Sequence, residues 1–319
     1  MKALWLDGEP RLRNDVPPPL PAAGEALVQV RLAGVCATDL ELMRGYHPFH
    51  GVLGHEFVGE IEAATDAPER VGERVVGEIN IACGSCPQCR AGRSMHCSQR
   101  QVAGIRERDG VFAEFVCLPL LNLHAVPNSV PDDAAVFCEP LAAALEVVQQ
   151  VPVTPDQRAL VIGAGRLGQL IARVLRLSGC ELAVVARHAR QRALLEAVGV
   201  RWVGEDAVAD AHADLVVEAT GSPSGFALAR RAVRPRGTIL LKSTYQGLLE
   251  ADFSSLVVDE ISLIGSRCGP FPAALRLLSQ GLVEPAPLVD ARFALTDGIA
   301  ALRRAAKPGV MKVLIDCRG

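Results

Sequence analysis

A glycine-rich turn between an apolar run and a helical stretch constrains the fold of this chain more than any other feature. The run 159–162 leads directly into the six residues 163–168, which have the spacing G-x-G-x-x-G, and a helical pattern follows to Leu177. In that context the glycines allow a tight turn and a close backbone approach to a pyrophosphate, and the helix N-terminus offers free N–H groups. A glycine-rich turn without a ligand is the alternative interpretation. The motif predicts dinucleotide contacts from Gly163, Gly165, Arg166, Leu167 and Gly168.

The pattern around this turn predicts two domains of different class. Short apolar runs alternate with helical segments over 151–284, which indicates a parallel, doubly wound sheet. Over 1–150, short β-like runs recur between Gly and Pro signals, and no long helical period precedes about residue 132, so a mostly β domain is predicted there. We expect the segment from about 285 to 319 to complete this β domain and to end in a strand at 311–315.

The net charge, the apolar runs and the cysteine count indicate which kinds of partner molecule the protein can have. The net charge of -3 implies no large basic surface, which disfavours nucleic acid. No apolar run approaches the ~20 residues of a membrane span, and the first residues do not form a signal peptide. We therefore expect a cytoplasmic protein that acts on a small molecule, with no nucleic-acid or membrane partner. Ten cysteines in a reducing compartment favour metal binding or catalysis over disulfides.

Four of these cysteines lie close together in the sequence. Cys83, Cys86, Cys89 and Cys97 are separated by two, two and seven residues, with glycines and a proline between them. Four thiolates at such spacing can close a tetrahedral shell around zinc and leave no open position, so the zinc would be structural. The alternatives are four unrelated buried thiols or an iron–sulfur cluster.

The end of the second predicted strand bears on the choice of coenzyme. An acidic residue that binds the ribose 2′-hydroxyl would stand about 20 residues after the glycine motif. The chain instead has Arg187 and His188 there, with Arg190 nearby. A guanidinium suits a 2′-phosphate, so this segment predicts a preference for NADP(H) over NAD(H). The alternative is that these arginines form a solvated helix surface.

Several short motifs, taken in order, resemble those of the zinc-containing medium-chain alcohol and polyol dehydrogenases. They are Cys36 with Thr38 and Asp39, the Gly-His-Glu of 54–56, the Gly-Glu-Arg-Val of 72–75, the four-cysteine segment and the Glu-Pro-Leu-Ala of 139–142. The last has the form found in the sorbitol and threonine dehydrogenase branches. The resemblance covers nearly the whole chain. It implies a GroES-like catalytic domain, a Rossmann domain and a homodimer or homotetramer.

The resemblance also implies a second, catalytic zinc, and so two zinc ions per chain. Its ligands would be Cys36, His55 and a carboxylate, for which Glu56 and Glu139 are both candidates and Cys138 is a rival to Glu139. A catalytic zinc needs one open position. Asp39 would accept a hydrogen bond from the other nitrogen of His55 and so hold the ring.

Two further site residues follow from comparison with the family pattern. Thr38 would pass the substrate proton, because a hydroxyl both donates and accepts. Glu41 stands where many members have a relay histidine, and it could itself serve as the base. Lys312 stands where the family often places a basic residue near the coenzyme pyrophosphate, although an ordinary exposed lysine is the alternative.

The leading hypothesis is therefore a zinc-dependent alcohol or polyol dehydrogenase. It would transfer a hydride between a zinc-bound alcohol or carbonyl substrate and a nicotinamide coenzyme. One alternative is a zinc-independent reductase on the same fold. Another is a non-catalytic NADP(H)-binding protein with only a structural zinc, because fold alone does not establish activity.

Overall fold

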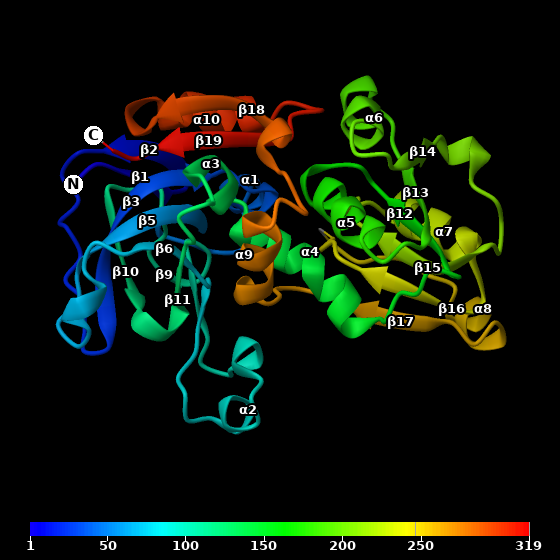
Figure 1. Ribbon diagram of the computed structural model, residues 1–319, viewed down its shortest axis with the longest axis horizontal. Helices are drawn as coiled ribbons and strands as arrows, with labels where there is room; N and C mark the ends of the chain where they lie inside the picture. The colour runs from blue at the N-terminus through cyan, green and yellow to red at the C-terminus, as the bar shows by residue number, and fades with distance from the viewer. Residues whose placement is uncertain (246, 319) are drawn as a thin grey trace. The chain divides into compact units, whose positions relative to one another are not determined.

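The computed structural model describes residues 1–245 and 247–318. The chain forms two compact units (Figure 1), the first made of Met1–Glu139 and the segment from Phe271 onward, the second of Pro140–Pro270. The first unit thus closes at Glu139 and resumes at Phe271, where the sequence predicted 150 and about 285. Each unit has its own sheet system and is described separately below.

The first unit is mostly β-structure, as the sequence predicts. Its main sheet has seven strands. In spatial order six of them are β11 (Leu123–Ala125), β6 (Arg74–Gly77), β5 (Glu56–Ala63), β3 (Glu25–Gly34), β19 (Lys312–Asp316) and β18 (Val289–Ala294), and β10 (Phe115–Pro119) also pairs with β3. A smaller sheet has the order β2 (Glu9–Arg13), β1 (Ala3–Asp7) and β4 (Gly51–Val52). The strand expected at 311–315 is β19, which pairs antiparallel with β3.

Alternating burial along β3 explains how this sheet closes on a core. Ala26, Val28 and Val30 point inward and are fully buried, while Gln29 between them is exposed. One cluster of apolar residues joins these positions to Phe57, Phe112 and the inner face of α10 (Gly298–Ala305). Three other helices of this unit concern the site: α1 (Ala37–Met43), α3 (Asp132–Ala135) and α9 (Phe271–Ser279).

A separate lobe leaves this unit between β6 and β10. It contains β7 (Asn80–Ile81), β8 (Gln101–Ala103) and β9 (Glu107–Arg108), with the single helical turn α2 (Pro87–Arg90) at its end. Figure 1 shows the loop with α2 projecting away from the strands of the first unit. The lobe has little apolar side-chain packing at its tip, where the residues 83–96 are exposed or half-buried. Something other than a hydrophobic core must hold that tip.

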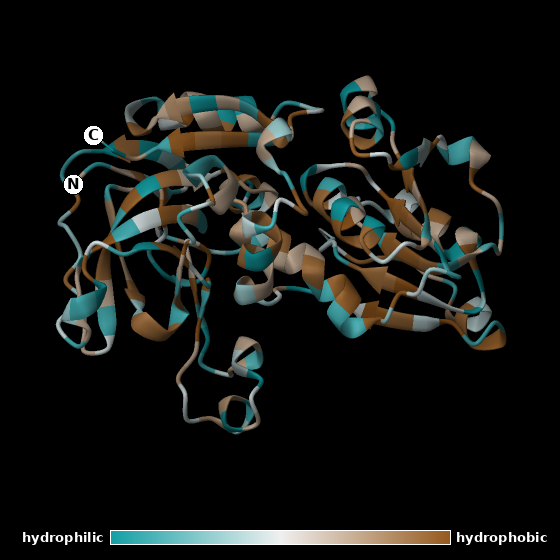
Figure 2. Cartoon of the chain, in the orientation of Figure 1, coloured by the Kyte–Doolittle hydropathy of each residue, from teal (hydrophilic) through white to brown (hydrophobic). Residues whose placement is uncertain are grey.

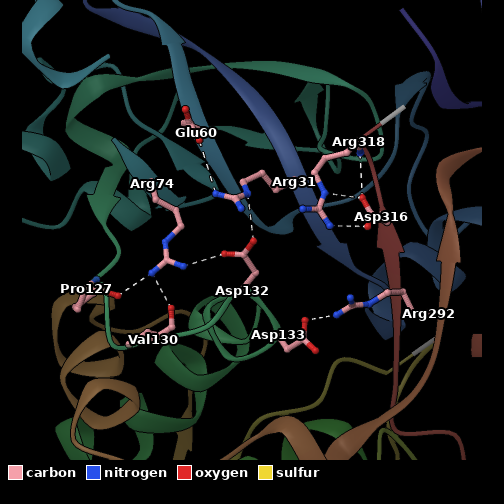
Figure 3. Close-up of polar contacts among 10 residues, drawn as sticks. All are labelled: Arg31, Glu60, Arg74, Pro127, Val130, Asp132, Asp133, Arg292, Asp316 and Arg318. Atoms are coloured by element: carbon pink, nitrogen blue, oxygen red, sulfur yellow. Dashed lines mark hydrogen bonds and ion pairs between the residues drawn. The ribbon is translucent and has the colours of Figure 1, made fainter. Parts of the chain in front are cut away.

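A network of charges fixes the segment before α3 in the same unit (Figure 3). Asp132 lies between two arginines, 3.1 Å from Arg74 Nη1 and 3.2 Å from Arg31 Nε. Arg74 also donates to the carbonyl oxygens of Pro127 and Val130, at 2.8 and 2.7 Å. Arg74 belongs to the Gly-Glu-Arg-Val segment that the sequence singled out. Its role in the structure is therefore to anchor the chain that enters α3.

The second unit is a parallel sheet of six strands, which confirms the predicted doubly wound class. The strand order is β14 (Arg201–Val203), β13 (Glu181–Val185), β12 (Arg158–Ile162), β15 (Ala213–Glu218), β16 (Val233–Leu241) and β17 (Ser262–Gly265). Its helices include α5 (Arg166–Arg176), α6 (Ala189–Glu196), α7 (Pro223–Ala232) and α8 (Phe253–Val258). The central strands are hydrophobic along most of their length (Figure 2), as expected for a sheet covered on both faces.

The order of these strands locates a binding region. The chain runs outward from β12 through β13 to β14, and then returns to the other side of β12 with β15. In open α/β sheets ligands bind outside the carboxyl ends of the strands at such a switch point. The glycine motif follows the carboxyl end of β12 and therefore lies at this switch point.

Candidate metal and coenzyme sites

The four cysteines of the lobe come together as one group of ligand atoms. All four Sγ atoms lie within 4.8 Å of one another. The Sγ–Sγ distances are 3.5 Å for Cys86–Cys89 and Cys83–Cys97, and 3.9 Å for Cys86–Cys97. In a tetrahedral shell with Zn–S bonds of about 2.3 Å, the sulfur atoms are about 3.8 Å apart. The spacing fits zinc, and a bound zinc would hold the tip that lacks an apolar core.

Backbone N–H groups in this lobe favour the thiolate form that binds metal. Hydrogen bonds from the backbone of Cys89 and Ser98 lower the pKa of Cys86 to about 5. The backbone and hydroxyl of Ser85 lower the pKa of Cys83 to about 7. Desolvation and its thiol neighbours instead raise the pKa of Cys89 to about 12. The fold thus favours the thiolate form at Cys86 strongly and at Cys83 in part.

A second group of ligand atoms consists of Cys36, His55 and Glu56, again within 4.8 Å of one another. Cys36 is the N-cap residue of α1, just after β3 ends, and Glu56 begins β5. Antiparallel pairing places Gly34 opposite Glu56, which brings the two segments together. A Cβ at Gly34 would lie 2.4 Å from the Glu56 carboxylate, so a larger residue here would displace that carboxylate from its position beside Lys312. His55 and Glu56 are buried, with exposed fractions of 3% and 1%.

The Asp39 carboxylate contacts both His55 and Cys36 of this group. One of its carboxylate oxygens lies 3.1 Å from His55 Nδ1, and the other accepts the backbone N–H of Cys36 at 2.8 Å. Burial alone would lower the pKa of His55, but the charges of Asp39 and Cys36 raise that pKa well above its usual value. With Nδ1 directed at Asp39, Nε2 is the nitrogen left for a metal. Asp39 thus lies beside His55, and its role in holding the ring stays a prediction.

Lys312 lies elsewhere than the sequence predicted. Its side chain is only 3% exposed and forms an ion pair with the Glu56 carboxylate, and its ammonium lies 5.4 Å from the centre of the Phe137 ring. It is therefore neither an exposed lysine nor a cation that is free to meet a pyrophosphate. The sequence could not show this, because the pairing depends on β19 returning beside β3.

The two candidate carboxylates, Glu56 and Glu139, lie in different surroundings. Of Glu56 and Glu139, only Glu56 joins Cys36 and His55 in the groups of possible ligands found among the described residues. Glu139 lies in the first turn of α4 (Cys138–Gln150). The rival Cys138 is fully buried, and burial raises the pKa of its thiol well above the usual value, so the thiol is neutral.

The two proposed proton-transfer residues both lie on α1. The Thr38 hydroxyl oxygen is 3.8 Å from Cys36 Sγ, so it is next to the ligand group. Glu41 is farther along the helix and pairs at 2.5 Å with Arg44, whose side chain is 59% exposed. Thr38 is therefore the better placed of the two, while Glu41 is engaged at the surface.

The three glycines of the motif have three different surroundings. Gly163 has φ +102°, and a Cβ there would lie 2.9 Å from the Ala219 carbonyl oxygen. A Cβ at Gly168 would lie 1.9 Å from the Gly163 carbonyl oxygen, so helix and turn pack backbone to backbone. A Cβ at Gly165, the N-cap of α5, would meet nothing within 4 Å. The turn is therefore tight on one side and open at the helix N-terminus, which fits a pyrophosphate.

The predicted contacts for a 2′-phosphate lie at the surface after β13. Arg187 is 62% exposed, His188 is the N-cap of α6 and Arg190 is exposed. Arg187 forms an ion pair with Glu205, which follows the neighbouring strand β14. The sequence analysis missed Glu205, because only the pairing of β13 with β14 brings it to Arg187.

The relatives of this chain identify its family. Residues 22–128 match the alcohol dehydrogenase GroES-like domain, and residues 167–280 match the zinc-binding dehydrogenase domain. The starvation-sensing protein RspB of Escherichia coli K12 is 32% identical over 86% of this chain and 86% of its own length. The chain belongs to the zinc-containing medium-chain dehydrogenase/reductase family. It is accordingly a zinc-dependent oxidoreductase that uses a nicotinamide coenzyme.

Other relatives show the range within this family. L-threonine 3-dehydrogenase of Pyrococcus abyssi is 29% identical over 92% of this chain and 90% of its own length. A zinc-binding dehydrogenase of Sinorhizobium meliloti, solved with NADP, has a TM-score of 0.91 at 29% identity and covers 99% of this chain and 98% of its own. RspB of E. coli CFT073, solved with NADH, has a TM-score of 0.90 at 27% identity, with 99% of both chains covered. No helix in the described part of the chain is long and apolar enough to cross a membrane.

The buried Glu56–Lys312 pair leads to a stability prediction. In Lys312→Met the Glu56 carboxylate would stay buried without its cation, which costs about 3–5 kcal/mol of unfolding free energy. Urea unfolding followed by circular dichroism measures this loss. The exposed Lys307→Met is the control and should change stability by less than about 0.5 kcal/mol. Adding Glu56→Gln to Lys312→Met should restore part of the loss, and an unchanged Lys312→Met would contradict the pairing.

Proposed function

We propose that this protein is an alcohol or polyol dehydrogenase that holds a catalytic zinc on Cys36, His55 and a carboxylate, Glu56 or Glu139, and a structural zinc on the four lobe cysteines. The observation that carries the proposal is the buried donor set around Cys36. The Cys36 thiol, the His55 imidazole and the Glu56 carboxylate lie within 4.8 Å of one another, and the Asp39 carboxylate lies beside His55. A thiol, an imidazole and a carboxylate are a donor set that suits zinc.

The chain's own residues would prepare the substrate around that centre. The bound zinc would supply the Lewis acidity that loosens the hydroxyl proton of an alcohol, and the coenzyme would take up the hydride. Asp39 would fix the orientation of His55, and the Lys312 ammonium pairs with the Glu56 carboxylate. Thr38, with its hydroxyl beside Cys36, would receive the proton, because the same hydroxyl can pass a proton onward.

A pair of matched cysteine substitutions tests this assignment. Wild-type protein should contain two zinc ions per chain by elemental analysis. Cys36→Ser should lose one zinc and all turnover but still bind coenzyme, whereas Cys89→Ser should lose the other zinc and mainly stability. Turnover is followed by nicotinamide absorbance with alcohols, polyols and 3-hydroxy amino acids. One zinc in the wild type, or full activity in Cys36→Ser, would refute the catalytic centre and favour the zinc-independent or non-catalytic alternatives.

We also propose that NADP(H) is the preferred coenzyme. The support is the exposed guanidinium of Arg187 and the neighbouring Arg190, which offer charge to a 2′-phosphate after β13. Glu205 opposes this preference, because its carboxylate already pairs with Arg187 and would have to release it. Relatives solved with NADP and with NADH leave both coenzymes open to the family.

This preference is measured by the affinities of NADPH and NADH for the wild-type protein and for Arg187→Ala. Wild-type protein should bind NADPH more tightly than NADH. Arg187→Ala should weaken NADPH binding about tenfold, since a hydrogen bond to a charged group contributes about 1.5–3 kcal/mol, and should leave NADH unchanged. The exposed Arg236→Ala serves as control. Tighter binding of NADH by the wild type would show that the preference is wrong.

We propose further that the protein assembles as a homo-oligomer through the second unit. β17 is the last strand of its sheet, and Leu263 on it is 40% exposed. Nearby in sequence, α8 exposes Phe253, Val257 and Val258 to 64%, 76% and 80%. An edge strand with apolar side chains is a usual place for a second copy to pair. Sedimentation should therefore give a dimer or tetramer that Leu263→Arg dissociates, and a monomeric wild type would contradict this.

A further inference from the structure

The second unit buries a carboxylate that has no cationic partner among the described residues. Glu218, the last residue of β15, has an exposed fraction of 0%. Within the described residues, every hydrogen bond to its carboxylate comes from a neutral donor group. One carboxylate oxygen accepts the backbone N–H of Thr220 at 2.6 Å and also the Thr220 hydroxyl, and the other accepts the Tyr245 hydroxyl at 2.6 Å.

Burying a carboxyl group costs free energy unless hydrogen-bond donors satisfy its oxygens. Buried polar groups are therefore normally hydrogen-bonded, and here three donors converge on one carboxyl group. The two oxygens of that group accept from all three donors. Burial and the bond to Glu218 raise the pKa of Tyr245, which keeps that hydroxyl protonated as a donor. The cluster therefore holds Thr220 and Tyr245 in fixed positions.

The turn held by this cluster lies against the glycine motif. Glu218 is opposite Ile162 in the sheet, the residue just before Gly163, and the Ala219 N–H donates to the Ile162 carbonyl at 2.9 Å. A Cβ on Gly163 would be 2.9 Å from both the Ala219 oxygen and Thr220 Cγ2. The first glycine of the motif thus packs directly on the turn that Glu218 fixes.

The same carboxylate joins a second loop to this turn. Tyr245 lies in the loop after β16, and the Lys242 N–H donates to the Glu218 backbone oxygen at 2.9 Å. Gly221 of the first loop would place a Cβ 3.5 Å from the Thr244 oxygen of the second. Residues 219–222 and 242–245 therefore lie side by side at the carboxyl ends of β15 and β16.

Strand order tells which half of a dinucleotide would meet this surface. The pyrophosphate lies at the N-terminus of α5, and the adenosine ribose lies at the end of β13, on one side of β12. The remaining half must extend to the other side of β12, where β15 stands. That half carries the nicotinamide.

We propose that Glu218 is a positioning residue for the nicotinamide half of the coenzyme. Through Thr220 and Tyr245 it fixes two loops as a preformed wall beside Gly163, so that the nicotinamide riboside meets an ordered surface. This rests on the proposed function only in requiring that a nicotinamide coenzyme binds. A preformed wall lowers the ordering cost of binding, so its loss weakens affinity.

Two conservative variants test the role. Tyr245→Phe removes one hydrogen bond, and Glu218→Gln keeps the side-chain shape but replaces acceptors by an amide. Both should raise the Kd and KM of NADPH and NADH roughly three- to tenfold, with kcat changed less than about twofold. Binding of 2′,5′-ADP or AMP, which lack the nicotinamide half, should be unchanged by calorimetry. Tyr46→Phe and the exposed Glu181→Gln are the matched controls.

Each result decides the proposal. Unchanged coenzyme affinity in both variants overturns it, as does an equal loss of affinity for the adenosine half alone, which indicates general loosening. If Glu218→Gln does not fold, Tyr245→Phe alone decides. A wild-type protein that binds 2′,5′-ADP or AMP but neither coenzyme refutes the wall while leaving the glycine motif intact. A wild type that binds none of these ligands refutes the coenzyme assignment and the wall with it.

Discussion

The pairing of β3 with β5 and β19 is the constraint on which the predicted catalytic centre depends. Gly34 lies opposite Glu56 on one side and Leu314 on the other. Because Gly34 has no side chain, the Glu56 carboxylate and the Lys312 stem can both occupy the space beside it. Cys36 follows two residues later at the start of α1. One register thus brings a thiol, an imidazole, a carboxylate and an ammonium from three distant segments into one buried group.

The two candidate metal groups show why one was easier to predict than the other. The lobe cysteines lie within fifteen positions, and tight turns at Gly84 and Gly92 suffice to close them, so spacing alone predicts the group. Cys36 and His55 come together only through sheet pairing, which spacing does not encode. Resemblance to a family supplied that group, and the structure shows Glu56, at the start of β5, beside Cys36 and His55.

The sequence predicted the glycine turn and the parallel sheet because both depend on local patterns. A strand, a turn of three glycines and a helix are adjacent in the chain, so the motif is visible in the local sequence. The partners of Arg187, Lys312 and Glu218 could not be predicted in this way. Glu205 reaches Arg187 across two neighbouring strands, and Tyr245 reaches Glu218 from the loop after the next strand. Strand order and register must be known before such pairs can be named.

The buried carboxylates of the two units are stabilised by opposite means. The Glu56 carboxylate pairs with the Lys312 ammonium and lies beside a thiol and an imidazole. Within the described residues, the contacts of the Glu218 carboxylate are instead an amide and two hydroxyl donors, which satisfy its oxygens. A carboxylate beside a thiol and an imidazole offers a metal one more ligand, whereas a carboxylate held by amide and hydroxyl donors fixes the loops that carry those donors. In the two proposals made above, the same residue type would therefore serve metal binding in one unit and coenzyme positioning in the other.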